Sequence, residues 1–82
     1  MRPQQLADLI RASLADAEVD VRSDDDVHFS ARVVSAAFVG KRPIQRHQLV
    51  YRALGDRMGG EIHALSIDAL TPEEAGAPRG AR

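Results

Sequence analysis

The sequence predicts one small α+β domain in the order helix, strand, strand, helix, strand. Two segments have the three- and four-residue apolar spacing of amphipathic helices, and three others alternate polar and apolar residues as half-buried strands do. A chain of 82 residues accommodates a single domain. The helix between the second and third strands allows a right-handed crossover, which makes those strands parallel. We therefore expect a three-stranded mixed sheet with helices on one face.

The first half of the chain predicts a helix and a hairpin. Residues 4–16 predict the helix, and Pro3 stands near its start, where a missing amide donor costs nothing. Residues 18–22 and 27–33 alternate and predict two strands, joined by the polar turn 23–26. The apolar face of the helix consists of Leu6, Leu9, Ile10 and Leu14.

The second half predicts a helix at 43–58, ended by Gly59-Gly60, and a third strand at 61–70. The apolar face of this helix consists of His47, Val50, Tyr51, Leu54 and Met58. One face of the third strand carries His63, Leu65 and Ile67.

The domain is expected to span residues 1–74, with a last helical turn opening at 71–74. Residues 75–82 are rich in Gly, Ala, Pro and Arg, and we expect them to form a disordered tail.

The composition narrows the function classes. The chain contains no cysteine, which excludes disulfides, thiol nucleophiles and a cysteine-ligated cluster held by this chain alone. No apolar run approaches the ~18 residues of a membrane-spanning helix. The first residues lack the features of a secretory signal, so we expect a cytoplasmic location. Because no nucleophile–base motif and no glycine-rich nucleotide motif is present, we expect neither enzymatic activity nor a small-molecule substrate.

Basic residues gather between Gly40 and Arg57. The turn Gly40-Lys41-Arg42-Pro43 opens the second helix, and free amides at such a turn can bind phosphate. Pro43 removes one amide donor, and Phe38 is the one nearby aromatic residue that could stack on a base. The alternative function is therefore nucleic-acid binding through a basic patch. This patch consists of Lys41, Arg42, Arg46 and Arg57.

Three stretches resemble the BolA-like family. They are residues 27–29 leading to 34–40, residues 45–51, and residues 62–67 closing on Thr71-Pro72-Glu73. The resemblance implies an α+β fold similar to a type II KH domain, and partnership with a monothiol glutaredoxin. Such pairs share a [2Fe-2S] cluster, to which the glutaredoxin and glutathione contribute thiolates, in iron–sulfur cluster trafficking or iron-responsive regulation. BolA-like proteins are also associated with transcriptional control, so the resemblance implies that the nucleic-acid-binding alternative would be a transcriptional regulator that contacts DNA.

The resemblance places the family's C-terminal histidine ligand on His63. The family's second ligand, a Cys or His, lies in the loop between the first two strands, which here is Ser23–Asp26 and contains neither. His28 follows this loop, at the same end of the sheet as His63, and is the candidate for the second ligand. Alternation argues against it, because it places Phe29 inward and His28 on the face opposite His63, unless the strand start is distorted. A loop aspartate is a weaker candidate, because carboxylates suit harder ions, and Asp24–Asp26 is expected to be a solvated turn.

His47 and Tyr51 lie one helical turn apart in the second resembling stretch. We expect both to pack at the edge of the core as structural signature residues rather than ligands. The helix 43–58 and the strand that carries His63 are expected to form the docking surface for the glutaredoxin.

Overall fold

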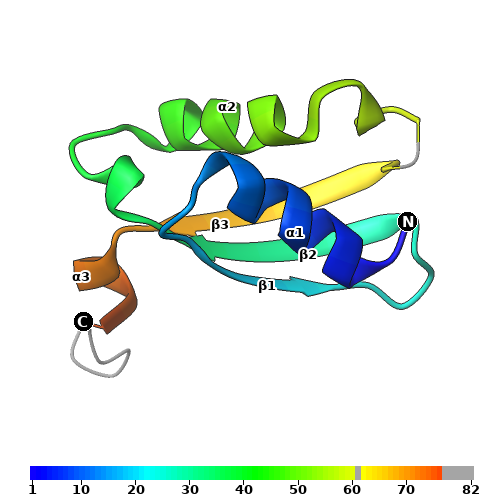
Figure 1. Cartoon of the computed structure of the whole chain (residues 1–82), viewed down its shortest axis with the longest axis horizontal. Coiled ribbons are helices and arrows are strands. Elements are labelled where there is room, and N and C mark those ends of the chain that lie inside the picture. The colour runs from blue at the N-terminus through cyan, green and yellow to red at the C-terminus, as the bar shows by residue number, and fades with distance from the viewer. Residues whose placement is uncertain (61, 77–82) are drawn as a thin grey trace.

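The computed structural model describes residues 1–60 and 62–76, and it contains a three-stranded sheet covered on one face by two helices (Figure 1). The elements are α1 (Pro3–Ser13), β1 (Glu18–Arg22), β2 (His28–Val34), α2 (Pro43–Leu54), β3 (Ala64–Leu70) and a short α3 (Pro72–Gly76). The predicted fold class and element order are confirmed. Within the described ranges, no helix is long and apolar enough to cross a bilayer.

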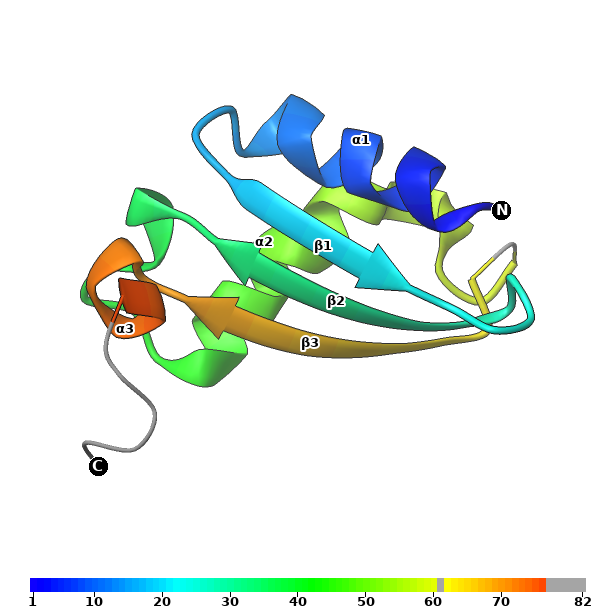
Figure 2. The same ribbon diagram turned by 90° about the horizontal axis from the view of Figure 1, so that it is seen from below.

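β2 is the central strand of the sheet. It pairs with β1 in antiparallel orientation and with β3 in parallel orientation, as predicted. The register sets Phe29 beside Leu65 and Ala31 beside Ile67, and these residues face the helices. Ser30 of β2 is exposed, and the face of the sheet away from the helices is open in Figure 2.

The core lies between the sheet and the two helices. Its fully buried side chains come from both helices, β2 and the connecting segments: Leu6, Ile10, Val33, Phe38, Val50, Leu54 and Ile62. Phe38 lies in a short 3-10 turn, Ala36–Phe38, and has no exposed surface. The interpretation of Phe38 as a stacking platform for a base was therefore wrong, because this ring is a central part of the core.

The two long helices have the same capping arrangement at their N-termini. Each begins with the sequence Arg-Pro-x-Gln, with the proline at the first helical position, where its missing donor is harmless. The side-chain oxygens of Gln5 and Gln45 accept the backbone N–H of Arg2 and Arg42, each at 2.8 Å. These glutamines satisfy amides that the helical hydrogen-bond pattern leaves without partners.

α1 ends at Ser13, three residues before the predicted end. The chain turns there, and the carboxylate of Asp16 accepts hydrogen bonds from the Ser35 hydroxyl and the Ala36 amide, both at 2.8 Å. These bonds, with the Ala36 amide contributing most, lower the pKa of Asp16. Asp16 thus joins the end of α1 to the end of β2, a contact between distant segments that periodicity does not reveal.

α2 ends at Leu54 and not at residue 58, because Gly55 adopts a φ of 56°. Side chains strongly disfavour this region, and glycine accepts it. Residues 55–57 then form a 3-10 turn, so Gly59-Gly60 does not end the helix directly.

β3 begins at Ala64 and not at residue 61. Ile62 forms an isolated parallel bridge with Met58, and Glu61 lies outside the described residues. At the other end, α3 continues through Ala75 and Gly76, two residues beyond the predicted domain boundary. The rest of the predicted tail, residues 77–82, also lies outside the described residues.

A candidate metal-ligating site at the start of the parallel strands

The structure brings His28 and His63 together. Their rings meet edge to face, with centroids 6.3 Å apart and planes at 87°. His28 is the first residue of β2, and His63 immediately precedes β3. Because β2 and β3 are parallel, both strands start at the same edge of the sheet. Both histidines are exposed, and the side chain of His28 is 64% accessible.

The prediction that His28 points away from His63 was wrong. It assumed that His63 belongs to the third strand, on the face of Leu65 and Ile67. His63 instead precedes the strand in a bend, where its amide donates to the carbonyl of Val27 at 3.1 Å. His63 is exposed while Leu65 and Ile67 are partly buried, because strand alternation begins only at Ala64.

Asp25 organises the loop that precedes His28. Its Oδ1 accepts the amides of Val27 and His28, at 2.9 and 2.8 Å. Its Oδ2 lies 2.7 Å from the His28 Nδ1. The His28 amide, then the His28 ring and the Val27 amide, hold the pKa of Asp25 far below its usual range. The acidic run is therefore not merely a solvated turn, because one of its carboxylates joins the loop to the candidate ligand.

Ser23 closes the same loop from its other end. Its hydroxyl donates to the His28 carbonyl at 2.6 Å and accepts the amide of Asp26 at 2.9 Å. Asp26 itself has a φ of 59°, which aspartate tolerates better than most residues. The backbone around His28 is thus fixed by side chains on both sides.

The donor set at this site consists of two imidazoles. Since Asp25 contacts the Nδ1 of His28, the Nε2 of that ring is the nitrogen left for a metal. Imidazole nitrogen suits iron, and paired histidines ligate one iron of Rieske clusters. Within residues 1–60 and 62–76, no group of three or more His, Cys, Asp and Glu side chains is placed to hold a metal ion. A [2Fe-2S] cluster takes four terminal ligands, so the residues fit one side of a cluster whose other ligands come from elsewhere.

His47 and Tyr51 have different environments on α2. His47 is partly buried, as its predicted place at the edge of the core requires. Tyr51 is 41% exposed, and the fully buried residues of the helix are Val50 and Leu54. The prediction that Tyr51 shares the buried face of the helix with Val50 and Leu54 was therefore wrong, because α2 turns this side chain outward.

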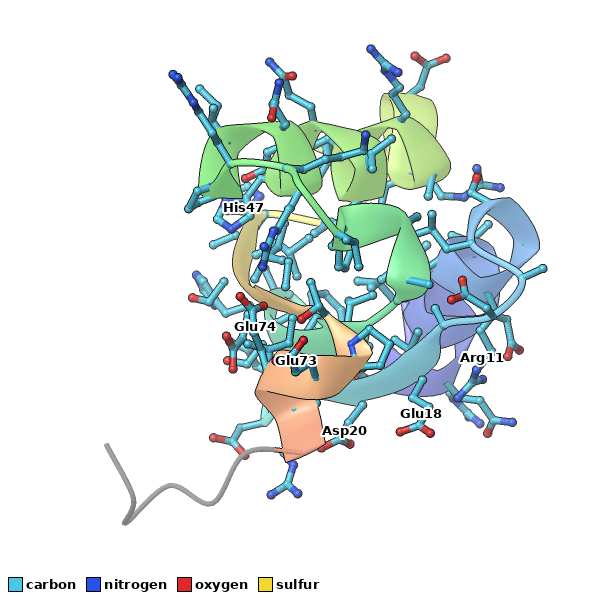
Figure 3. The ribbon with its side chains drawn as sticks, turned by 90° about the vertical axis from the view of Figure 1, so that its left-hand side faces the viewer. Arg11, Glu18, Asp20, His47, Glu73 and Glu74 are labelled. Atoms are coloured by element: carbon cyan, nitrogen blue, oxygen red, sulfur yellow. The ribbon has the colours of Figure 1, made fainter. Side chains whose placement is uncertain are left out.

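Arg46 is tied to other parts of the fold. Its guanidinium donates to Glu74 at 2.7 Å and to the carbonyls of Lys41 and Ala69 at 2.9 and 3.0 Å, and its side chain is 13% exposed. Figure 3 shows Glu74 on α3, below the end of α2 that carries His47. Arg46 first, and then the amide of Thr71, lower the pKa of Glu74 to about 2. Arg46 thus holds α3 against α2 and β3, which reduces its availability to a phosphate.

The remaining basic residues do not form one patch. Arg57 follows α2 at its far end and lines a hollow beside Gln5 and Asp8 of α1. The 12 residues of α2, at about 1.5 Å of rise each, separate Arg57 from Lys41 and Arg42.

The turn at the start of α2 also has fewer free amides than predicted. The amide of Lys41 donates to the Phe38 carbonyl, and that of Arg42 donates to Gln45. The exposed side chains of Lys41 and Arg42 remain, next to Val39 and Ile44, which are 63% and 65% exposed.

The sequence analysis did not predict two of these contacts, the capping box of Thr71 and Glu74 and the contact of Asp25 with His28. Thr71 and Glu74 have the three-residue spacing of a capping box, and the bonds from the Thr71 amide to Glu74 and from the Glu74 amide to the Thr71 hydroxyl are both present. That signal was available. Nothing in the sequence distinguishes Asp25 from the aspartates on either side of it.

The fold is that of a small α+β domain with two exposed imidazoles at one edge of its sheet. The chain belongs to the BolA-like family, because a sequence profile for BolA-like protein matches residues 3–74. This family is not known as enzymatic.

Relatives and solved structures agree with this assignment. An uncharacterized protein in the rpoN-murA intergenic region of Acinetobacter guillouiae is 43% identical over 75 residues, which are 90% of this chain and 89% of that protein. The structure of a bolA protein homologue from Coxiella burnetii superposes with a TM-score of 0.85 at 35% identity, covering 94% of this chain and 99% of the other.

The DNA-binding transcriptional regulator BolA of Vibrio cholerae is 42% identical over 55 residues, which are 67% of this chain and 52% of that protein. The chain spans only 34 to 39% of the length of five further BolA-like relatives from animals and a plant.

Proposed function

We propose that this chain is the non-enzymatic partner of a monothiol glutaredoxin in the cytoplasm, and that the two proteins share a [2Fe-2S] cluster with glutathione. The role is iron–sulfur cluster trafficking or iron-responsive regulation. The observation that carries the proposal is the edge-to-face contact of His28 and His63, which lie 35 positions apart in the sequence (63 − 28). Neither imidazole fills the core, and both residues are exposed to a ligand from outside the chain.

The two histidines supply neutral nitrogen ligands on this protein's side of the complex. The glutaredoxin and glutathione supply thiolates on the other side. Histidine in place of thiolate raises the potential of a cluster, as in Rieske centres. The shared form is therefore expected to be reduced more easily than a cluster ligated by thiolates alone.

The docking surface of this proposal consists of α2 and the segment that carries His63. α2 turns Ile44 and Tyr51 outward, with exposed fractions of 65% and 41%. Apolar side chains of this size on one exposed helix are suited to contact with another protein.

Visible circular dichroism of a cluster-loaded monothiol glutaredoxin with glutathione tests the proposal. Addition of the wild-type protein should change the cluster spectrum, and His63→Ala and His28→Ala should each reduce the change. His47→Ala is the matched control, since it removes the third histidine from α2 and should leave the change intact. An unchanged spectrum with the wild-type protein, across several monothiol glutaredoxins, would contradict the proposed function. A full response from His28→Ala would remove His28 from the ligand set.

A second candidate function is DNA binding through Lys41 and Arg42. It is favoured by the exposure of both cations beside Gly40 and by the name of the Vibrio cholerae relative. Two phosphate contacts predict that log K falls with log salt with a slope of about −1.8. Titration of duplex DNA at several salt concentrations should give this slope for the wild type, and the double variant Lys41→Ala/Arg42→Ala should abolish it. Equal affinity of the variant and the wild type would exclude this surface.

A further inference from the structure

We propose that Asp25 is a positioning residue that decides which ring nitrogen of His28 is offered as a ligand. It holds the proton on Nδ1, so that Nε2 carries the free lone pair. The consequence for the cluster rests on the proposed function above, but the position of the proton is a property of this chain alone.

The contact geometry fixes the direction of the hydrogen bond. Asp25 Oδ2 and His28 Nδ1 are 2.7 Å apart, which is a short charge-assisted hydrogen bond. An ionised carboxylate only accepts hydrogen bonds, so the proton of a neutral ring must lie on Nδ1. The bond made by one imidazole nitrogen determines whether the other can bind a metal.

Both oxygens of the Asp25 carboxylate are engaged in hydrogen bonds. Its Oδ1 accepts the amides of Val27 and His28 while Oδ2 faces the ring. Ser23 holds the His28 carbonyl at 2.6 Å. The residue that orients the ring and the backbone that carries the ring are therefore one hydrogen-bonded unit.

A carboxylate behind a histidine ligand orients the ring and raises its basicity, and loss of such a partner usually costs 10–100-fold in metal affinity. The loop of this chain has neither Cys nor His. The loop thus contributes the carboxylate of Asp25, which orients the ring of His28 and holds the proton on its Nδ1.

Asp25→Asn is the discriminating variant. The asparagine oxygen can still accept the amides of Val27 and His28, so the loop keeps these bonds. The asparagine NH₂ group then faces Nδ1 and can only donate, which forces Nδ1 to accept and moves the ring proton to Nε2. Asp24→Asn makes the same change of charge one position earlier and is the matched control.

Nitrogen-detected NMR of the isolated protein at about pH 8.5, which is about two units above the pKa of free imidazole, gives the first readout. The wild type and Asp24→Asn should carry the His28 proton on Nδ1, and Asp25→Asn should carry it on Nε2. The rings of His47 and His63 should not change. A wild-type His28 protonated on Nε2 would overturn the proposal, and this measurement needs no variant to fold. A His28 of Asp25→Asn that keeps its proton on Nδ1 would also overturn it.

Visible circular dichroism with the cluster-loaded glutaredoxin gives the second readout. Asp25→Asn should weaken the spectral response, by no more than His28→Ala does, whereas Asp24→Asn should respond as the wild type does. A full response from Asp25→Asn would overturn the role of Asp25 in ligand choice. A wild-type protein that leaves the cluster spectrum unchanged would instead overturn the proposed function, and the NMR result would still decide whether Asp25 sets the tautomer.

Discussion

Replacement of Ile62 by alanine tests whether the buried residue before His63 anchors that histidine beside His28. Ile62 is fully buried, forms a bridge with Met58, and donates its amide to the Arg57 carbonyl at 3.0 Å. The change removes three methylene-sized groups at about 0.8 kcal/mol each. The cavity adds to this, giving an expected loss of about 3 kcal/mol.

The total stability of a domain of 82 residues is about 4–12 kcal/mol, so Ile62→Ala should remain folded at 25 °C in all but the weakest case. Its melting temperature should fall by roughly 12–24 °C, at 4–8 °C for each kcal/mol. Ile44→Ala is the matched control, because Ile44 is 65% exposed and its loss should cost less than about 0.5 kcal/mol.

Urea denaturation followed by far-ultraviolet circular dichroism measures both free energies of unfolding. In the same samples, proton NMR signals of His28 and His63 should shift in Ile62→Ala and stay in place in Ile44→Ala. A loss below about 1 kcal/mol for Ile62→Ala, or equal losses for the two isoleucines, would refute the inference that Ile62 is the anchor. Unmoved histidine signals in Ile62→Ala would refute its link to the site.

Two further predictions concern the rest of the fold. Glu74→Gln removes the carboxylate that Arg46 binds, and in the folded protein the pKa of Glu74 is lowered from 4.5 to about 2. Its stabilising effect is complete above the unfolded pKa and is lost as the pH falls through the folded pKa. The difference in melting temperature between wild type and variant should therefore be greatest at neutral pH and disappear below the folded pKa of about 2. A difference independent of pH would contradict this. Gly55→Ala should cost about 1 kcal/mol or more, because the added Cβ is strained at positive φ. Gly60→Ala, whose Cβ would meet no atom closer than 3.8 Å, should be nearly neutral in the same urea titration, and equal costs would show that strain at Gly55 is absent.

The order of elements was predictable because hydrophobic periodicity is a local property that reports directly on burial. Leu6 and Ile10 on α1, and Phe29 and Val33 on β2, are all buried as the pattern required. The ends of the helices were not predictable from the same pattern. α1 ends where Asp16 bonds to residues about twenty positions away, so the cause lies in tertiary structure.

The candidate site was predicted only in part, for the same physical reason. Parallel strands placed His28 and His63 at one edge of the sheet, and this was correct. The face of the sheet predicted for His63 was wrong, because a hydrogen bond from its amide to the Val27 carbonyl, and not strand alternation, determines the backbone conformation at His63. The sequence placed Arg46 in a basic patch for DNA, because the local pattern contains no information on Glu74, which lies 28 positions further along the chain.

The parallel pairing of β2 with β3 makes the two imidazoles a signature of the completed fold. β3 is the last strand of the sheet, and its pairing with β2 closes a long loop that contains all of α2. Such non-local contacts form slowly, because closing the loop costs entropy before the contacts stabilise the chain. A chain that is still emerging, cut within α2 or partly melted at β3 has both histidines but not their proximity. Under the proposed function, only molecules that have finished folding would therefore ligate the iron–sulfur cluster, and no separate factor would be needed to exclude unfolded ones.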